Sequence, residues 1–544
     1  MKLFAPLCSA LFMLVTNSTF GGAQEFSPPA SGNSSAAANE QALNSPSSEQ
    51  LFSSGGGGGV SCGPRIRKSW DRMLPQEKEL YLRAIEMSMD NGLYIKFVEI
   101  HTEQMTTAEA HRTCMFIYWH RLFLLGFENM LRAYGGEFSC ITVPYWNYVD
   151  HNALFLSGAC RSMEDCSPIL RELGGSRIGS TQTVDINGTP IQGTCVTARP
   201  ANHFCESSGL RGNQCARCIP RGDWSGTDFP PTVSVSSLLR QLFSSPTIAD
   251  VATNIEQGAH NTIHNSLAGA MANLEAPADP IFFSHHATLD LLHTIYYKCV
   301  VGNTTPMTLQ AKLQDPRQFT QCARRIPLGG RSVDRNVLLP QSSVSVRSGG
   351  KTEQALSVFE PINPLDAFFA ALPDEYLSFS DVRDIGEFSY NYEITGLLAD
   401  MYTTCGGLTS LLQPSGLAGL NRNLRSEQSM NSGSLLEAVV IPSETTDNWY
   451  REAFEAAVNT TSLTEASNGD AMKNALAEVE KMTCVFYDEC RGKVRDYSTQ
   501  FRQNFRQTDS TPCSKILTAI KSGKDQINVP AWRNIFLRHL ECVH

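Results

Sequence analysis

The chain lacks an excess of basic residues. Its 544 residues include 44 Lys and Arg against 54 Asp and Glu, which gives a formal net charge of −10. Proteins bind nucleic acids and anionic lipid surfaces through clustered cations that neutralise phosphate, so this balance argues against either partner. Hydrophobic residues make up 42% of the chain and charged residues 18%, which is typical of a folded globular protein.

Long apolar runs are also missing after the first 15 residues. Lys2, the apolar stretch Leu3–Val15 and small residues up to Ala23 have the pattern of a secretory signal peptide, and the stretch is too short to span a bilayer. The C-terminus is polar, which argues against a lipid-anchor tail. We therefore expect residues 1–23 to be a signal peptide and the protein to be secreted, with no membrane span.

Cysteine, in contrast, is abundant, with 17 residues. Cys8 falls in the signal peptide, and the remaining even number predicts disulfides in an exported chain, although spacing does not give their connectivity. For the C-x-x-C pair Cys215 and Cys218, a structural disulfide is favoured over a zinc or redox site. Four sequons are expected to be available for glycans: Asn33, Asn187, Asn303 and Asn459.

Composition divides the rest of the chain into four segments. Residues 24–60 are rich in Ser, Ala, Gly and Asn and are predicted to be a disordered leader. The core domain is expected at 61–405, with disulfide-braced loops between Ala159 and Pro231. A linker rich in Ser, Asn and Gly is expected at 406–434, and amphipathic helices with four cysteines at 435–544.

Helical periodicity predicts a mainly α fold. Apolar residues recur at steps of three and four over Asp71–Asp90, Tyr118–Tyr134 and Ser284–Tyr297. Residues 340–395 are expected to be mixed, with short strands, and there is no internal repeat.

Most of the 12 histidines fall into two clusters about 140 residues apart. The first holds His101, His111 and His120, and the second holds His260, His264, His285, His286 and His293. Two clusters suggest two metal ions, or one site assembled from both. Three imidazoles for each ion, with no thiolate or carboxylate nearby, suit copper or zinc.

The spacing within the clusters restricts how they can share a metal. His260 and His264 are four residues apart, so both side chains lie on one face of a helix. His111 and His120 are nine apart and would lie on opposite sides of a straight helix, so His111 is predicted in the turn before the helix that carries His120.

Adjacent residues on a helix point about 100° apart, so only one of His285 and His286 should face the metal. Imidazole binds metal when neutral, and its other ring nitrogen needs a hydrogen-bond acceptor. Asp290, four residues beyond His286, is a candidate for that acceptor.

Four ordered motifs contain or follow these histidines. They are AHRTCMFIYWHRLFLLGFE (Ala110–Glu128), VPYWNY (Val143–Tyr148), GAHNTIH (Gly258–His264) with ADPIFFSHHATLD (Ala278–Asp290), and YNY (Tyr390–Tyr392). In this order they resemble the first copper motif, a following marker, the second copper motif and the closing tyrosine pair of the tyrosinase family of type-3 copper proteins. The resemblance covers roughly residues 62–395.

The resemblance implies ligands for two copper ions. They are His101, His111 and His120 for the first ion, and His260, His264 and His286 for the second. In the family the second of two adjacent histidines is the ligand, which favours His286 over His285. His293 is expected further along the same helix, without touching metal.

The resemblance also implies a substrate region. Glu256 and Asn261 are similar to a pair thought to hold the water that takes the proton from a phenol, whose pKa of about 10 requires a base or metal help. Alternatively, Glu256 is a solvated helix charge, and Asn261 makes a helix hydrogen bond or supports His260. Leu274 is expected at the mouth of the site. Glu109 stands where several family branches have a cysteine linked to histidine, so no thioether is predicted.

The implied fold is a four-helix bundle with the two coppers between helix pairs. The implied activity is that of a tyrosinase or polyphenol oxidase, which hydroxylates monophenols and oxidises o-diphenols to o-quinones with dioxygen, leading to melanin-like pigment or cross-linked protein. The alternatives are a catechol oxidase, a hemocyanin-like oxygen carrier and a zinc-loaded isomerase of pigment precursors. In related latent enzymes a C-terminal domain covers the copper site, so the tail after Gly406 is expected either to do this or to be a structural module.

Overall fold

A computed structural model describes residues 61–302, 305–320, 322–325, 333–350, 354–405, 435–442, 448–462 and 468–543. They all belong to one compact unit, residues 48–544. The signal peptide, leader and linker expected at 1–23, 24–60 and 406–434 lie outside the described residues.

The mainly α prediction is confirmed. The core helices are α2 (Pro75–Asp90), α3 (Tyr94–Thr102), α4 (Gln104–Ala110), α5 (Phe116–Arg132), α6 (Tyr148–Leu156), α7 (Met163–Cys166), α8 (Pro168–Glu172), α9 (Val235–Phe243), α10 (Ile248–Ile255), α11 (Asn261–Leu267), α12 (Ile281–Tyr296), α13 (Leu309–Gln314), α14 (Asp366–Phe369) and α15 (Gly396–Thr404). The tail adds α16 (Asn448–Ser462), α17 (Asn468–Cys490), α18 (Thr499–Asn504), α19 (Pro512–Lys521) and α20 (Trp532–His539).

Local chemistry explains where the predicted helices begin and end. The helix predicted from Asp71 begins at Pro75, because proline suits the first helical position and the Glu77 carboxylate accepts a hydrogen bond from the Leu74 N–H (2.7 Å). The helix predicted to Tyr134 ends at Arg132, shortly before Gly135 turns the chain at φ +70°.

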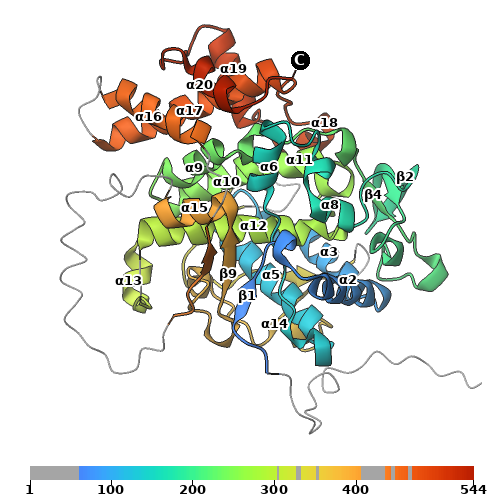
Figure 1. Cartoon of the computed structure of the whole chain (residues 1–544). Coiled ribbons are helices and arrows are strands. Elements are labelled where there is room, and N and C mark those ends of the chain that lie inside the picture. The colour runs from blue at the N-terminus through green and yellow to red at the C-terminus, as the bar shows by residue number, and fades with distance from the viewer. Residues whose placement is uncertain are drawn as a thin grey trace, which may run out of the picture. The chain divides into compact units, whose positions relative to one another are not determined.

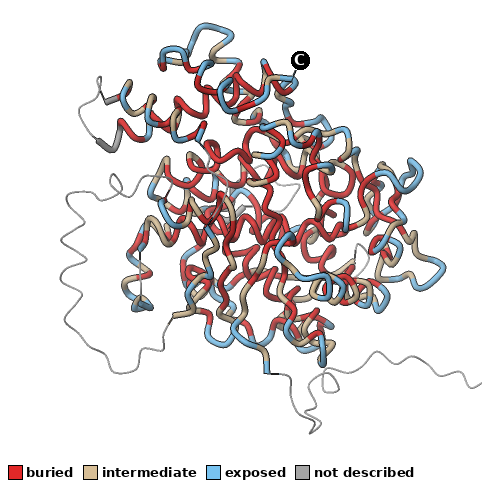
Figure 2. The backbone as a smooth tube through the Cα atoms, in the orientation of Figure 1, coloured by how far each residue is buried: buried red, intermediate tan, exposed pale blue. Residues whose placement is uncertain are grey.

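Helices α5 and α12 form the centre of the molecule (Figure 1), and the tube through them is buried in Figure 2. Every residue of α12 is buried. The two helices pack through Phe127 and Phe283, whose ring centroids are 3.5 Å apart. The close packing extends to Gly126, where a Cβ would lie 2.0 Å from the Phe369 ring.

Short strands join distant parts of the chain. One parallel sheet has the order β1 (Arg65–Arg67), β9 (Tyr390–Thr395), β10 (Val439–Ile441), with Arg67 opposite Tyr392. An antiparallel sheet of β2 (Gly179–Ile186), β3 (Thr189–Val196) and β4 (Ile219–Arg221) lies within the predicted loop region. The remaining pairs are β5 (Cys322–Arg325) with β6 (Val333–Leu338), and β7 (Arg347–Ser348) with β8 (Leu356–Ser357).

The disulfide prediction is confirmed for all 16 cysteines after Cys8. The pairs are Cys62–Cys140, Cys114–Cys322, Cys160–Cys166, Cys195–Cys218, Cys205–Cys215, Cys299–Cys405, Cys484–Cys513 and Cys490–Cys542. The C-x-x-C cysteines therefore pair with other residues and not with each other. None of the helices within the described residues is both long enough and apolar enough to cross a membrane.

Candidate metal centre

The first histidine group comes from helix α3, the turn after α4, and helix α5. His101 lies in the last turn of α3, and His120 lies on α5. His111 follows α4 with an extended backbone (φ −121°, ψ 145°), so it precedes α5 as its spacing predicts. One ring nitrogen from each lies within 4.8 Å of the others, and all three side chains are buried.

The second group is built around a break in a helix. Between α10 and α11 the chain makes a π-helical turn, Glu256–His260, in which Gly258 leaves helical geometry at φ −86° and ψ −106°. This turn presents His260 beside His264 of α11, with ring centroids 4.5 Å apart. His286 of α12 completes a group whose nitrogens also lie within 4.8 Å of one another.

The two groups face each other in one buried centre. The rings of His120 and His286 stack with centroids 4.2 Å apart, and those of His111 and His260 are 6.0 Å apart. The six side chains can therefore hold two neighbouring ions, and the structure brings together the same six residues that the sequence points to.

Backbone carbonyls determine which ring nitrogen is available to a metal. The Nδ1 atoms of His101, His120 and His264 lie 2.6, 2.8 and 2.6 Å from the carbonyl oxygens of Leu274, Phe116 and Met271. A carbonyl can only accept a hydrogen bond, so each neutral imidazole carries its proton on Nδ1 and keeps a lone pair on Nε2. The Nδ1 atoms of His111 and His260 face Thr107 O (3.2 Å) and Asn261 Oδ1 (2.9 Å).

The electrostatics keep these imidazoles neutral. Burial lowers the pKa of His101 to about 4 and that of His264 to about 3, and it lowers the pKa of His120 well below the ordinary value. Within the described part of the chain, the buried Nε2 atoms of His101, His120, His260, His264 and His286 have no hydrogen-bond partner. Buried polar atoms are normally paired, so this donor set fits metal ions of the copper or zinc type.

The other two histidines of the second cluster lie outside the metal groups. His285 stands beside His264, with ring centroids 5.2 Å apart, but does not belong to its group. His293 accepts a hydrogen bond at Nδ1 from Arg121 Nη2 (2.9 Å).

Asp290 is not the acceptor predicted for His286. Its carboxylate accepts hydrogen bonds from Arg121 Nε (2.6 Å) and from the Tyr390 hydroxyl (2.6 Å), and it pairs with Arg67 Nη1 (3.4 Å). Burial alone would raise the pKa of Asp290, but Arg121 and Arg67 lower it. Two buried guanidinium groups need a counter-charge more than a neutral imidazole needs an acceptor, which explains the difference.

A pocket beside His111 collects the predicted substrate residues Glu256, Asn261 and Leu274. Both Glu256 carboxylate oxygens accept from the Arg112 N–H, at 2.8 and 3.0 Å. Asn261 directs its side-chain oxygen to His260, which is the supporting contact considered from the sequence. Leu274 both lines the pocket and holds His101 through its carbonyl.

The sequence reasoning missed Phe505, which reaches the centre from the tail. Its ring centroid lies 5.7 Å from that of His264 and 6.3 Å from that of His111, and it lines the pocket with Asn504 and Gln507. A signal was present, because Tyr497, Phe501 and Phe505 recur every four residues on a segment that otherwise has an exposed, polar composition.

The predicted absence of a thioether concerns Glu109 and Cys114. The sulfur of Cys114 is bonded to Cys322. Glu109 accepts a hydrogen bond from the Tyr376 hydroxyl (2.7 Å) and another from the Ser345 N–H (2.9 Å), so it fastens the loop that follows β6 to the helix preceding His111.

Comparison with known proteins finds similarities for the part of the chain that carries the centre. Residues 91–298 match the family described as the common central domain of tyrosinase. Tyrosinase-like protein phomQ1′ of Diaporthe leptostromiformis is 25% identical over 245 residues, 42% of this chain and 62% of that protein. Tyrosinase of Streptomyces lincolnensis is 27% identical over 251 residues, which make up 42% of this chain and 80% of that protein. A tyrosinase-like protein of Pinctada maxima is 28% identical over 249 residues, which make up 42% of this chain and 51% of that protein.

The chain therefore spans about three fifths of the length of the first of these relatives. Among solved structures, a functional unit of octopus hemocyanin aligns with 63% of this chain and 73% of its own at 16% identity and a TM-score of 0.35. Recombinant mushroom tyrosinase aligns with 57% of this chain over 61% of its own, at 18% identity and a TM-score of 0.32.

Proposed function

Because residues 91–298 match the family described as the common central domain of tyrosinase, we propose that this protein is a copper oxidase of the type-3 class that uses dioxygen to oxidise phenols. The observation that most supports the proposal is the pair of facing histidine groups, each with three nitrogens within 4.8 Å. In this proposal His101, His111 and His120 hold one copper ion, and His260, His264 and His286 hold the other.

Bound copper would supply the electron transfer and the binding of dioxygen. The protein would supply a rigid, buried site from which water is excluded. The Phe116 ring lies 4.7 Å from that of His120, and the Phe282 ring lies 4.2 Å from that of His286, so aromatic side chains keep water from the imidazoles. The carbonyl contacts at Nδ1 would orient the lone pairs of four of the six imidazoles toward the ions, namely those of His101, His111, His120 and His264.

We propose that Glu256 and Asn261 hold a water that takes the proton of a monophenol. The carboxylate lies in the pocket next to His111, where a phenol approaching the ions would arrive. A base in this position makes ortho-hydroxylation of monophenols possible, followed by oxidation of the o-diphenol to an o-quinone.

A catechol oxidase is the second candidate, and one observation favours it. Both Glu256 oxygens already accept from the Arg112 N–H, so the carboxylate is bound to the backbone of the turn that follows His111. A catechol oxidase depends less on a protein base, because its substrate has a more acidic hydroxyl than a monophenol.

We infer that the chain is exported, because eight disulfides join the cysteines of its described part and such bonds persist in oxidising compartments.

We further propose that the tail keeps the enzyme latent. Phe505 occupies the approach to His264 and His111, where a substrate ring would have to lie. Arg112 Nη1 also donates to the Arg506 carbonyl (3.3 Å), which ties the tail to the turn that carries His111.

The test is oxygen uptake by copper-loaded protein, with Phe505→Ala beside the unchanged protein, on tyrosine and on a catechol. Uptake on both substrates by the variant supports a latent tyrosinase. Uptake on the catechol alone supports the second candidate. Two bound coppers with no oxygen uptake by either protein would contradict both the tyrosinase and the catechol oxidase proposals. Equal uptake by the two proteins would contradict the proposal that the tail keeps the enzyme latent.

A further inference from the structure

A second cavity lies outside the metal centre, where β1 and α2 meet the end of α5. Its volume is about 280 Å³, against about 30 Å³ for the pocket beside His111, and the two share no lining residue. A volume of this size is close to that of the smaller ligand pockets of proteins. The cavity can therefore hold a ligand of its own, whether or not the proposed function is correct.

The walls of the cavity are fixed by covalent and hydrogen bonds. The disulfide between Cys62 and Cys140 forms part of the wall. On the same side, Thr142 Oγ1 donates a hydrogen bond to the Ile66 carbonyl (3.2 Å), which joins the loop after α5 to β1. Because the space is already formed, little conformational entropy is lost when a ligand enters it.

Much of the wall is apolar. Ile66, Met73 and Leu80 border the cavity and are only half-buried, and the ring of Tyr81 and Pro144 lie beside them. An apolar ligand group lying against these side chains would remove their exposed area from water, which is favourable in proportion to the area covered.

The charged side chains of the wall do not balance. Its two carboxylates, Glu77 and Glu137, already pair with Lys68 (2.6 Å) and with Arg83 (2.9 Å). Arg132 also lies in the wall, but no carboxylate in the described part of the chain pairs with it. The cavity therefore contains a guanidinium group without a counter-charge.

Arg65 adds to this positive charge. Its Nη1 pairs with Glu128 at 3.4 Å, but the same carboxylate also pairs with Arg67 Nε at 3.1 Å. Burial lowers the pKa of Arg132, and the charge of Arg65 lowers it further. A bound anion would act in the opposite direction, because an opposite charge nearby favours the ionised form.

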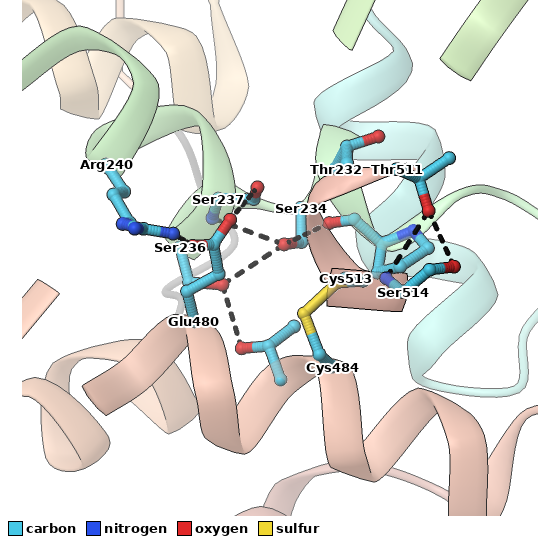
Figure 3. The surroundings of a disulfide bond; sticks show 12 residues. Thr232, Ser234, Ser236, Ser237, Arg240, Glu480, Cys484, Thr511, Cys513 and Ser514 are labelled. Atoms are coloured by element: carbon cyan, nitrogen blue, oxygen red, sulfur yellow. Dashed lines mark hydrogen bonds and ion pairs between the residues drawn. A yellow bond between two sulfur atoms is a disulfide. The ribbon is translucent and has the colours of Figure 1, made fainter. Parts of the chain in front are cut away.

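Arg240 of α9 shows the arrangement that Arg132 lacks. It is half-buried as well, and it forms an ion pair with the buried Glu480 of α17 (Figure 3). Charged side chains that are removed from water are normally paired in this way. The missing partner of Arg132 thus points to a counter-charge supplied by a ligand.

We propose that this cavity binds a small organic acid, whose carboxylate pairs with Arg132 and Arg65 and whose apolar chain lies against Ile66, Met73 and Leu80. A guanidinium group can hold a carboxylate through two parallel hydrogen bonds. An inorganic anion would leave the apolar wall exposed to water, and a neutral apolar molecule would leave the positive charge uncompensated, so both should bind more weakly.

The experiment measures the binding of octanoate to copper-loaded full-length protein by isothermal titration calorimetry. Acetate and 1-octanol are the comparison probes, since the first lacks the chain and the second lacks the charge. We expect octanoate to bind about tenfold more tightly than 1-octanol, or better, because hydrogen bonds between charged groups contribute at least that much. This comparison needs no variant, so it does not depend on the folding of one.

The variants locate the site. Arg132→Gln should weaken octanoate binding about tenfold, and Arg132→Lys should keep part of the affinity, because the charge remains. Arg72→Gln is the matched control, because Arg72 is an exposed arginine that pairs with Glu393 (3.4 Å) and does not line the cavity. It should leave octanoate binding unchanged. Circular dichroism and copper content verify that each variant is folded.

Equal affinity for octanoate and 1-octanol would overturn the inference, and so would the absence of octanoate binding. Equal affinity of acetate and octanoate would show that the apolar wall takes no part and would contradict the proposed class of ligand. Equal octanoate binding by Arg132→Gln and Arg72→Gln would place the acid elsewhere on the protein, for example at the metals, and would overturn the inference as well.

Discussion

His286 and His293 lie on the same helix and are both buried, yet their surroundings differ. His286 stands in the second metal group, whereas His293 accepts a hydrogen bond from Arg121. We therefore expect His286→Asn to lose about one copper ion per chain, because two imidazoles alone hold the second ion poorly. His293→Asn is the matched control and should keep both ions. Elemental analysis of the two purified variants gives the answer, and equal copper content would refute the assignment of His286.

Glu256 allows a second prediction at the level of single residues. If its carboxylate holds the water that takes the proton of a monophenol, Glu256→Gln should slow oxidation of tyrosine about 100-fold, within the range of general-base effects. Oxidation of a catechol should change far less. Steady-state oxygen uptake on both substrates is measured with Phe505→Ala as the background. An equal loss on both substrates would show that Glu256 acts only through its hydrogen bonds to Arg112.

The residues of the site differ in how far the sequence predicts them. Histidine spacing and motif order are enough to indicate the six clustered imidazoles, because they depend on the period of one or two helices. The same reasoning does not predict that Arg67 pairs with the Asp290 carboxylate. Arg67 reaches it from a strand 223 positions away in sequence, and only the paired strands β1 and β9 bring that guanidinium beneath α12.

At the level of helices, Gly126 is a point where α5 tolerates no side chain. A Cβ at this position would lie 2.0 Å from the Phe369 ring, whereas a Cβ at Gly63 would meet nothing within 4 Å. Gly126→Ala should lower the free energy of unfolding by about 1–3 kcal/mol, as overpacking typically does, and Gly63→Ala should not. Urea denaturation measures the difference. Equal stability of the two variants would show that α5 and α14 pack less tightly than described.

Periodicity predicts α5 and α12 to within a few residues, because each has an uninterrupted pattern of apolar side chains. It does not predict the π-helical turn Glu256–His260 between α10 and α11. That turn depends on Gly258, where the Gln241 side chain approaches so closely that a Cβ would lie 2.3 Å from its oxygen. A contact from another helix thus determines the local backbone that presents His260.

At the scale of the whole molecule, the disulfides that close the longest loops should contribute most to the free energy of unfolding. Cys299–Cys405 spans 106 residues and Cys160–Cys166 spans 6. Loop-closure entropy predicts a loss of about 5 kcal/mol for C299A/C405A and about 2 kcal/mol for C160A/C166A. Equilibrium unfolding in guanidinium chloride compares them at equal copper content, since bound metal also stabilises the native state. The reverse order of stability would contradict the entropic account for this fold.

The place of the tail is the feature of the whole molecule that the sequence predicts least. Amphipathic spacing indicates its helices, but their partners come from other helices, as Ser237 of α9 shows for Glu480 of α17. The position of Phe505 follows from these contacts and from Cys484–Cys513, and spacing alone does not give disulfide connectivity.

The most direct test of the central claim is the metal content of the purified full-length chain after loading with copper and removal of excess ion, with zinc measured in parallel. The account predicts two copper ions per chain, one for each histidine group. A single ion, or zinc that copper does not displace, would contradict a type-3 copper centre.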